Sequence, residues 1–331
     1  MKVAVVGGGS WGTALSVHCA RAGHEVVLWA REPEVVEGVN RERRNPLFLP
    51  EVTLPPGLTA EGDVAQAVSA AEVVFFVVPV QFARGVLREM KAALPVQAVL
   101  VSASKGIEVA SLSRMDEVVA QELGLEPERF VALSGPTFAR EVAAGLPAAA
   151  VLAGRSPSSL RMLQEAFSTP SFRLYRSADV VGVELAGALK NVIAIAGGMA
   201  TGLGLGHNAL AALLTRGLHE IARLGVRLGG QPETFRGLAG MGDLVLTCTG
   251  ALSRNRAVGE RLGRGEPLEQ VLSGREVAEG VPTARAAAAL ARKNQVEMPI
   301  TFAVEAILDQ RLSPREAVTA LMTRSLKEEL E

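Results

Sequence analysis

The sequence predicts an α/β protein, in which an N-terminal Rossmann domain with a doubly wound sheet is followed by a C-terminal all-helical domain. Three observations support this fold class. A glycine-rich turn follows the first apolar run, strand-like runs alternate with helical patterns through the first half, and the strand signal disappears after about Asp179. Such alternation is typical of a parallel, doubly wound sheet. We therefore expect the Rossmann domain over residues 1–179 and the helical domain over residues 180–331.

The expected strands are short apolar runs. They lie at Val3–Val6, Val26–Trp29, Val73–Val78, Ala98–Ser102, Phe130–Leu133 and Ala148–Leu152. Helical spacing of apolar residues predicts helices between several of them and throughout the second half. These helices are expected at Thr13–Ala22, Ala83–Leu94, Leu112–Leu123, Val180–Met199, Asn208–Leu228, Arg256–Leu262, Pro282–Lys293, Thr301–Gln310 and Pro314–Leu321. Asn208 is expected to cap its helix, and Pro282 and Pro314 suit first turns.

The glycine-rich turn lies between the first strand and the first helix. Its sequence is Gly7-Gly8-Gly9-Ser10-Trp11-Gly12. In that context the G-x-G-x-x-G spacing is typical of dinucleotide-binding folds. Gly7 permits the tight turn, Gly9 lets the backbone approach a pyrophosphate, and Gly12 lets the helix pack closely on the strand. The free N–H groups at the helix start then face the anion. We predict a dinucleotide site; the alternative is a glycine turn without a ligand.

The end of the second strand bears on the choice of cofactor. Sites selective for NAD usually carry an acidic residue near this position, which binds the ribose 2′-hydroxyl. Here the sequence is Trp29-Ala30-Arg31-Glu32. Arg31 suits the 2′-phosphate of NADP(H), whereas Glu32 beside it keeps NAD(H) possible.

Lysine is rare in this chain, with six lysines among 34 basic residues, so a lysine in apolar surroundings stands out. Lys190 is the only charged residue between Leu185 and Gly206. An unpaired buried ammonium group is costly, so this setting implies a partner or a cleft. Because a desolvated lysine changes its protonation state readily, Lys190 is a candidate general acid or base. The alternative is a lysine whose stem covers the core while its ammonium group reaches water.

Three further segments could carry chemistry. Lys105 follows a strand at the edge of the sheet where ligands bind in such folds, although it could be an ordinary loop lysine. Asp243 lies between Gly242 and an apolar run and could balance the charge of Lys190, although N-cap aspartates are common. Ser253-Arg254-Asn255 opens a helix, where a hydroxyl, a guanidinium and an amide beside helix N–H groups suit a phosphate. The alternative for that tripeptide is a surface cap.

Together these segments resemble the soluble NAD(P)-dependent sn-glycerol-3-phosphate dehydrogenases of bacteria, over essentially the whole chain. Five motifs of that family occur in order. They are the glycine turn from Gly7 to Ala14, Asn45 to Pro50, Ser134 to Glu141, Gly187 to Asn191, and Gly240 to Asn255. One departure is Thr201, where the family usually has an acidic residue; this position is outside the expected chemistry.

The resemblance implies reversible reduction of dihydroxyacetone phosphate to sn-glycerol 3-phosphate by NADPH or NADH, which supplies the glycerophospholipid backbone. The implied catalytic residues are Lys190, which transfers the proton, and Lys105 and Asp243, which orient groups and balance charge. The implied substrate-binding residues are Lys105, Gly135, Thr137, Lys190, Asp243, Ser253, Arg254 and Asn255. The implied cofactor-binding residues are Gly7, Gly9, Ser10, Trp11, Gly12, Arg31, Phe48, Lys105, Ala139, Arg254, Val277 and Glu279.

Composition argues against several other classes of protein. The net charge of −1 disfavours a general nucleic-acid binder. Cys19 and Cys248 lie far apart without metal-ligand spacing, so neither a disulfide framework nor a metal site is expected. No signal peptide is expected, because Met1-Lys2 leads directly into a strand. The apolar stretch from Leu185 to Gly206 is expected to be a buried helix and a glycine loop, not a membrane span. We expect a cytoplasmic homodimer, although the sequence itself does not fix the oligomeric state.

Two alternatives remain open at this point. One is another Rossmann dehydrogenase with a lysine, similar to ketopantoate reductases or hydroxyacid dehydrogenases. The phosphate-binding tripeptide Ser253-Arg254-Asn255 argues against it. The other is a regulator that binds NAD(P) without turnover, which would need neither a buried lysine nor a second anion site.

Overall fold

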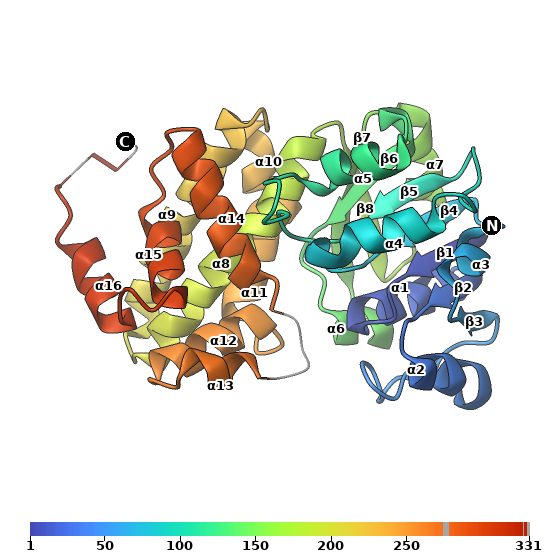
Figure 1. Ribbon diagram of the computed structural model, residues 1–331, viewed down its shortest axis with the longest axis horizontal. Coiled ribbons are helices and arrows are strands. Elements are labelled where there is room, and N and C mark those ends of the chain that lie inside the picture. Colours follow the sequence, from blue (N-terminus) through green and yellow to red (C-terminus); the bar gives the residue numbers. More distant parts are fainter. Residues whose placement is uncertain (274–277, 327, 330–331) are drawn as a thin grey trace.

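The structure, a computed structural model, describes residues 1–273, 278–326, 328 and 329. Figure 1 shows two parts side by side: the first half of the chain forms a sheet with helices around it, and the second half forms a cluster of helices. Helix α8 (Val180–Gly202) runs from the sheet into the helical cluster and lies at its centre. The α/β fold class predicted from the sequence is confirmed.

Eight strands form one sheet in the order β3-β2-β1-β4-β5-β6-β7-β8. Neighbouring strands are parallel except for β6 and β7, which are antiparallel. Because β1 pairs with both β2 and β4, the chain reverses its direction across the sheet at β1, and ligands bind at such a switch point. The strands are β1 (Lys2–Val6), β2 (Glu25–Trp29), β3 (Leu58–Glu61), β4 (Val73–Phe76), β5 (Val99–Ser102), β6 (Phe130–Ser134), β7 (Ala148–Gly154) and β8 (Phe172–Ser177).

The two strands that the sequence analysis did not predict, β3 and β8, are the two edges of the sheet. In β8, Phe172 and Leu174 are buried whereas Arg173 and Tyr175 are exposed. An edge strand with one face in water alternates in this way and lacks the continuous apolar run of a central strand. β3 is only four residues long, which leaves little pattern to detect.

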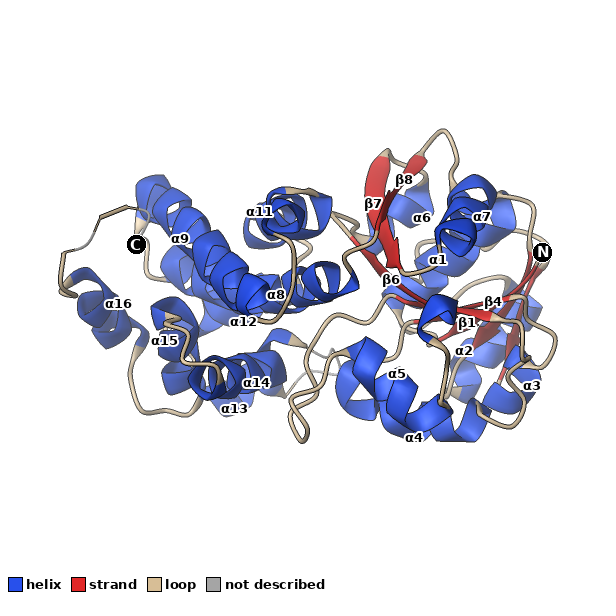
Figure 2. Ribbon diagram, turned by 90° about the horizontal axis from the view of Figure 1, so that it is seen from above, coloured by secondary structure: helices blue, strands red, loops and turns tan. Residues whose placement is uncertain are grey.

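Helices cover both faces of the sheet, as Figure 2 shows. One face packs against α1, α6 and α7, whose buried residues include Leu15, Val142 and Leu163. The other face packs against α3, α4 and α5, whose buried residues include Leu87 and Val118. The helices of this half are α1 (Ser10–Arg21), α2 (Pro33–Glu37), α3 (Val64–Val68), α4 (Ala83–Met90), α5 (Met115–Leu123), α6 (Ala139–Ala144) and α7 (Pro157–Phe167).

The helical part is built around α8. This helix is long and apolar enough to cross a membrane, but 83% of its most apolar stretch is buried inside the protein, as expected of a core helix. The other helices are α9 (Gly206–Arg227), α10 (Pro232–Arg236), α11 (Asp243–Thr249), α12 (Arg254–Gly263), α13 (Leu268–Leu272), α14 (Gly280–Lys293), α15 (Pro299–Leu308) and α16 (Pro314–Met322).

Several predicted helix starts differ from the observed ones by two or three residues, and the backbone explains two of these differences. Asn208 does not cap α9, because the helix already begins at Gly206, directly after a glycine turn with Gly204 at φ 73°. The predicted helix from Leu112 begins instead at Met115, because Leu112 has a left-handed backbone with φ 61°, which a right-handed helix cannot contain.

Helices α8 and α12 lie so close together that only glycine fits between them. A Cβ at Gly259 would lie 1.9 Å from the carbonyl oxygen of Ile195, and a Cβ at Gly198 would lie 2.0 Å from the carbonyl oxygen of Arg256. Both obstructing atoms belong to the backbone, so no side chain can move aside. This packing holds the start of α12 against the helix that carries Lys190.

We expect Gly259→Ala to lower the free energy of unfolding by about 1–3 kcal/mol, because the added methyl group forces two backbones apart. Denaturant unfolding measures the loss. Gly85→Ala is the matched control: Gly85 is also helical, nothing in the structure lies within 4 Å of its added Cβ, and alanine is the better helix former. Equal stability of the two variants would contradict this account of the packing.

Candidate active site

The candidate active site lies where the carboxyl ends of β5 and β6 meet α8 and α11. Lys105 follows β5, Gly135 follows β6, Lys190 lies on α8 and Asp243 is the first residue of α11. These four residues come from segments far apart in the sequence. Asp243 is not an N-cap, since Gly242 holds that position.

One buried carboxylate joins the two lysines. The Nζ of Lys105 lies 2.6 Å from Oδ2 of Asp243, and the Nζ of Lys190 donates to Oδ1 of the same carboxylate. Lys190 is 6% exposed and Asp243 is 1% exposed. Lys105 is half-buried and also donates to the carbonyl oxygen of Gly135 at 3.2 Å. The ammonium group of Lys190 therefore does not reach water along the protein surface but ends in a charged cluster.

Thr247 completes the surroundings of Lys190, and sequence reasoning missed it. The Nζ of Lys190 lies 2.8 Å from Oγ1 of Thr247, and that hydroxyl donates to the carbonyl oxygen of Asp243 at 2.6 Å. Thr247 follows Asp243 by four residues on α11, so both side chains lie on one helix face. That spacing is the signal that could have identified it.

The cluster shifts the acidity of its members. Burial lowers the pKa of Lys190 to about 8; Asp243 opposes this effect and the nearby charge of Lys105 adds to it. Burial would raise the pKa of Asp243, but the ammonium groups of Lys105 and Lys190 outweigh burial and hold that pKa below its usual value. Near neutral pH the cluster thus contains a carboxylate and a lysine that can gain or lose a proton.

Gly135 and Thr137, which the sequence analysis named as substrate-binding residues, belong to the turn after β6 that Lys105 contacts. Gly135 has φ 152°, and a Cβ there would lie 2.8 Å from Cα of Ala150. A larger residue would displace β7 or the loop. The carbonyl oxygen of Gly135 accepts from both Lys105 and Oγ1 of Thr137, the latter at 3.2 Å. This turn therefore fixes the direction from which Lys105 enters the site.

The predicted phosphate-binding tripeptide does open α12, but two of its three side chains form hydrogen bonds within the protein. Ser253 caps the helix, accepting from the N–H of Arg256 at 3.2 Å. The amide of Asn255 donates to Oδ1 of Asn191 at 2.9 Å and accepts from the N–H of Gly280 at 2.9 Å. Arg254 is exposed at the helix start. Asn255 thus links α8, α12 and α14, a structural role that the sequence did not reveal.

The glycine turn fits a dinucleotide pyrophosphate. Gly7 has φ 127°, and a Cβ at Gly12 would lie 1.8 Å from the carbonyl oxygen of Gly7, so both must be glycine. Gly9 differs, because nothing in the protein lies within 4 Å of an added Cβ, which leaves space for a ligand beside the backbone. Among the described residues, no side chain caps α1 and no acidic residue lies in its first turn. No side chain of the described residues therefore competes with an anion for the N–H groups at this helix end.

A buried asparagine docks the predicted Phe48 segment onto this turn. Asn45 donates to the carbonyl oxygen of Gly8 at 2.8 Å and to Oγ1 of Thr13 at 2.7 Å. Ser10 Oγ donates to the carbonyl oxygen of Phe48 at 2.8 Å. Trp11 and Phe48 are half-buried and pack against the same core. The predicted cofactor-binding residues around the turn thus form one connected structure.

Glu279 and Ala139 lie at two other borders of the site. The half-buried Glu279 accepts a hydrogen bond from the backbone of Val80, and burial raises its pKa to about 7, against the charges of Arg254 and Lys105. Ala139 is the first residue of α6. Val277, which the sequence analysis also assigned to the cofactor site, lies outside the described residues.

Arg31 is 79% exposed, and its guanidinium lies 3.6 Å from Glu32. We expect Arg31→Ala to weaken NADPH binding about tenfold to a hundredfold, because a hydrogen bond to a charged group contributes roughly 1.5–3 kcal/mol. NADH binding should weaken much less. Fluorescence titration of both reduced cofactors into wild type and variant measures this effect. If Arg31 merely pairs with Glu32, the ratio of the two affinities will not change.

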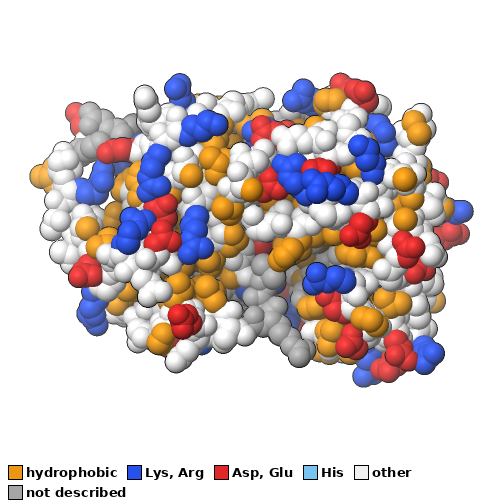
Figure 3. Space-filling model, in the orientation of Figure 1, with side chains coloured by type: hydrophobic (Ala, Val, Ile, Leu, Met, Phe, Trp, Pro, Cys, Tyr) orange, Lys and Arg blue, Asp and Glu red, His pale blue; other side chains and the backbone are white. Residues whose placement is uncertain are grey.

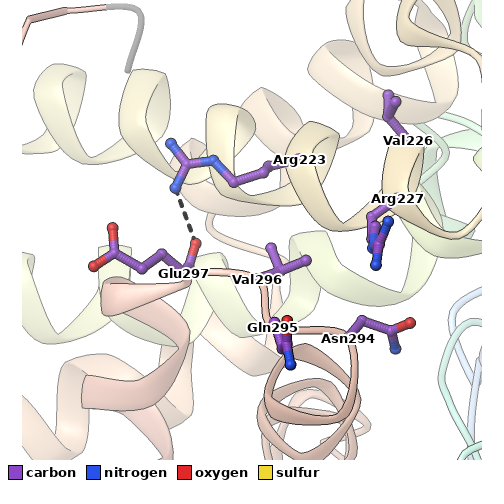
Figure 4. Close-up of a pocket in the computed structure, with 7 residues that line it drawn as sticks. All are labelled: Arg223, Val226, Arg227, Asn294, Gln295, Val296 and Glu297. Carbon is purple, nitrogen blue, oxygen red and sulfur yellow. Dashed lines mark hydrogen bonds between the residues drawn. The ribbon is translucent and has the colours of Figure 1, made fainter.

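Two surface features lie outside this site: a depression and a region of mixed charge. A depression of about 390 Å³ lies between α9 and the turn after α14, and Figure 4 shows Arg223, Asn294 and Glu297 among its lining residues. None of the lysine cluster lines it. On the face drawn in Figure 3, basic and acidic side chains are interspersed. Within the part of the chain that the structure describes, no three metal-ligating side chains lie together.

Comparisons with known proteins agree with the motifs. Residues 2–159 match the model of the N-terminus of NAD-dependent glycerol-3-phosphate dehydrogenase, and residues 179–319 match the model of its C-terminus. This chain belongs to the NAD-dependent glycerol-3-phosphate dehydrogenase family. Two curated relatives named glycerol-3-phosphate dehydrogenase [NAD(P)+] are similar over 99% of this chain. They are the protein of Citrifermentans bemidjiense (54% identical, 98% of its length covered) and that of Geobacter sulfurreducens (53%, 98%).

Solved structures place the chain in the same dehydrogenase family. The glycerol-3-phosphate dehydrogenase of Coxiella burnetii is 41% identical, with a TM-score of 0.93 over 98% of this chain and 99% of that one. A ketopantoate reductase from Ralstonia eutropha has a TM-score of 0.59 at 18% identity, over 96% of this chain and all of that one. At that identity the likeness shows a shared fold alone. The ketopantoate reductase alternative is therefore not supported by family membership.

Proposed function

We propose that this protein catalyses the reversible, NAD(P)H-dependent reduction of dihydroxyacetone phosphate to sn-glycerol 3-phosphate. One observation carries the proposal beyond family membership. A buried lysine with a pKa of about 8 shares a carboxylate with a second lysine, at the sheet edge between the cofactor turn and the start of α12. A site of this kind can bind a phosphorylated ketone and transfer a proton to it. The regulator alternative gives no reason for this cluster.

Residues of this chain transfer the proton and balance the charges of the reaction. A bound nicotinamide supplies the hydride to the carbonyl carbon. Lys190 in its ammonium form donates a proton from Nζ to the carbonyl oxygen as that oxygen becomes an alkoxide. In the reverse direction the neutral amine of Lys190 accepts the hydroxyl proton. Asp243 and Thr247 hold Nζ in place, so the lysine does not have to reorient during the reaction.

Lys105 and Arg254 act on the substrate rather than on the proton. Lys105 is held by Asp243 and Gly135 and presents its charge toward the carbonyl, where negative charge develops in the transition state. Arg254, at the N-terminus of α12, pairs with the phosphate through its guanidinium. The helix N-terminus favours the same negative charge.

The test is a panel of substrates in an assay that follows NADPH oxidation. Dihydroxyacetone phosphate should react, whereas glyceraldehyde 3-phosphate and unphosphorylated dihydroxyacetone should react far more slowly. Arg254→Ala should raise KM for dihydroxyacetone phosphate. The ratio of kcat/KM for dihydroxyacetone phosphate to kcat/KM for dihydroxyacetone should therefore fall. Equal rates of wild type with dihydroxyacetone phosphate and dihydroxyacetone would contradict the proposal that the site binds the phosphate. The absence of turnover with any carbonyl compound would support the alternative of a regulator that binds NAD(P) without turnover.

The same proposal includes a cytoplasmic enzyme that acts as a homodimer and supplies the glycerophospholipid backbone. The helical part exposes several large apolar side chains that a partner subunit could cover. Leu205, Val226, Met241, Val245 and Leu252 are among them. Sedimentation equilibrium decides between a particle of twice the chain mass of 34.7 kDa and a monomer.

A further inference from the structure

The loop that carries Lys105 spans residues 103–114, between β5 and α5. It is folded back on itself: the N–H of Leu112 donates to the carbonyl oxygen of Glu108 at 2.8 Å, and the N–H of Glu108 donates to the carbonyl oxygen of Ser113 at 3.0 Å. These bonds close the segment from Glu108 to Ser113, which begins three residues after Lys105. Contacts that hold the start of this segment therefore also restrict the backbone at Lys105.

Gln81 makes one such contact from the short helix η2 (Val80–Phe82), which follows β4. Its Nε2 donates to the carbonyl oxygen of Ile107 at 2.9 Å, and its Oε1 accepts from the N–H of Val109 at 3.1 Å. Gln81 is exposed, so water could satisfy its amide without these bonds. The two bonds therefore fix the backbone of the loop at Ile107, two residues beyond Lys105, and at Val109.

Arg84 makes a second contact from the first turn of α4. Its guanidinium donates to both carboxylate oxygens of Glu108, at 2.7 and 2.8 Å, a two-point geometry that fixes orientation as well as distance. Glu108 is 7% exposed, and Arg84 holds its pKa below the usual range. Arg84 also donates to Glu122 of α5 at 2.7 Å. The loop is thus tied to α4 at its centre and, through Arg84, to α5.

We propose that Gln81 and Arg84 are positioning residues that hold Lys105 at Asp243. Their hydrogen bonds reach the loop and not Lys105 itself, so they act through the loop. The inference rests on the proposed function, since it concerns the same reaction.

The position of Lys105 has an electrostatic signature. Among the residues that the structure describes, the charged and titratable groups that face Lys190 are Lys105, Asp243, Cys248 and Glu279. The charge of Lys105 lowers the pKa of Lys190 and that of Asp243 raises it. If Lys105 moves away from Asp243, Lys190 keeps its carboxylate partner and loses a repelling neighbour. The pKa of Lys190 must then rise, and the pH above which ketone reduction declines must rise with it.

The test compares Gln81→Ala, Gln81→Glu and Arg84→Gln with the control Arg88→Gln. Arg88 lies one turn further along α4 and pairs with Glu122, but not with the Lys105 loop. We expect the first three variants to lose about tenfold to a hundredfold in kcat/KM for dihydroxyacetone phosphate, since small misplacements of a site group have effects of this size. KM for NADPH should change much less than kcat/KM for dihydroxyacetone phosphate. Gln81→Glu should be worse than Gln81→Ala, because its carboxylate faces the carbonyl oxygen of Ile107.

The pH profile separates positioning from mere stability. The decline of kcat/KM at alkaline pH should move to higher pH in the three variants, in the same direction as in Lys105→Met, and should stay in place in Arg88→Gln. Unchanged profiles and kcat/KM values equal to the control would overturn the proposal, even if the melting temperature falls. If Arg84→Gln does not fold, Gln81→Ala still decides, because it removes an exposed side chain. Failure of the wild type to reduce dihydroxyacetone phosphate would instead reject the proposed function.

Discussion

Lys190→Ala is expected to lower kcat for ketone reduction by about 10²–10⁴, the range typical of a lost general acid or base. The reason is geometric. Lys190 is buried, its Nζ is held by Asp243 and Thr247, and burial brings its pKa to about 8. The glycine turn belongs to a different part of the chain, so the affinity for NADPH should stay nearly unchanged. Steady-state kinetics and a cofactor titration measure the two effects separately.

A matched control for this variant is Lys293→Ala. Lys293 is the last residue of α14 and is exposed, so its removal takes away a lysine without touching the site. Its kcat should equal that of wild type. A Lys190→Ala enzyme with kcat within a few-fold of wild type would show that another group, or water, supplies the proton.

Asp243→Asn is expected to have the second largest effect. The change keeps the shape of the side chain but leaves two ammonium groups close together without their shared carboxylate. Removal of one partner from a buried ion pair typically costs about 3–5 kcal/mol. Part of this cost is avoided if Lys190 loses its proton, so its pKa should fall well below the wild-type value of about 8.

The measurable result is a loss of reduction at neutral pH that is partly restored at lower pH, where Lys190 regains its proton. Urea unfolding should show a lower free energy of unfolding as well. A variant whose alkaline decline stays at the wild-type pH would contradict the role given to the shared carboxylate.

Much of the fold follows from the sequence because central strands and core helices have strong patterns. The runs Val73–Phe76 and Val99–Ser102 are buried at every position and were predicted as strands. β8 was not, because Arg173 and Tyr175 lie exposed between its buried residues. The contact between α8 and α12 was also invisible, since it depends on glycines whose partner backbone belongs to another helix.

The site residues also fall into two groups: those that a local sequence pattern reveals, and those whose role depends on contacts between distant segments. Lys190 stands out in the sequence as the only charged residue between Leu185 and Gly206, and Asp243 as a carboxylate next to an apolar run. Their pairing could only be suggested, because it depends on how α11 packs against α8. Asn255 has partners on two other helices, and Gln81 acts on a loop 26 residues away. Local patterns do not encode such contacts.

The most direct test of the central claim, that Lys190 transfers the proton, is the pH dependence of kcat/KM in both directions for the wild type. Reduction needs the ammonium form of Lys190, so kcat/KM should be constant below about pH 8 and fall tenfold per pH unit above it. Oxidation of sn-glycerol 3-phosphate needs the neutral amine and should rise up to the same pH and then level off. Glu279→Gln separates any contribution of Glu279, whose pKa is about 7. If kcat/KM for reduction stays constant from pH 7 to well above the pKa of about 8, Lys190 does not transfer the proton in the way proposed.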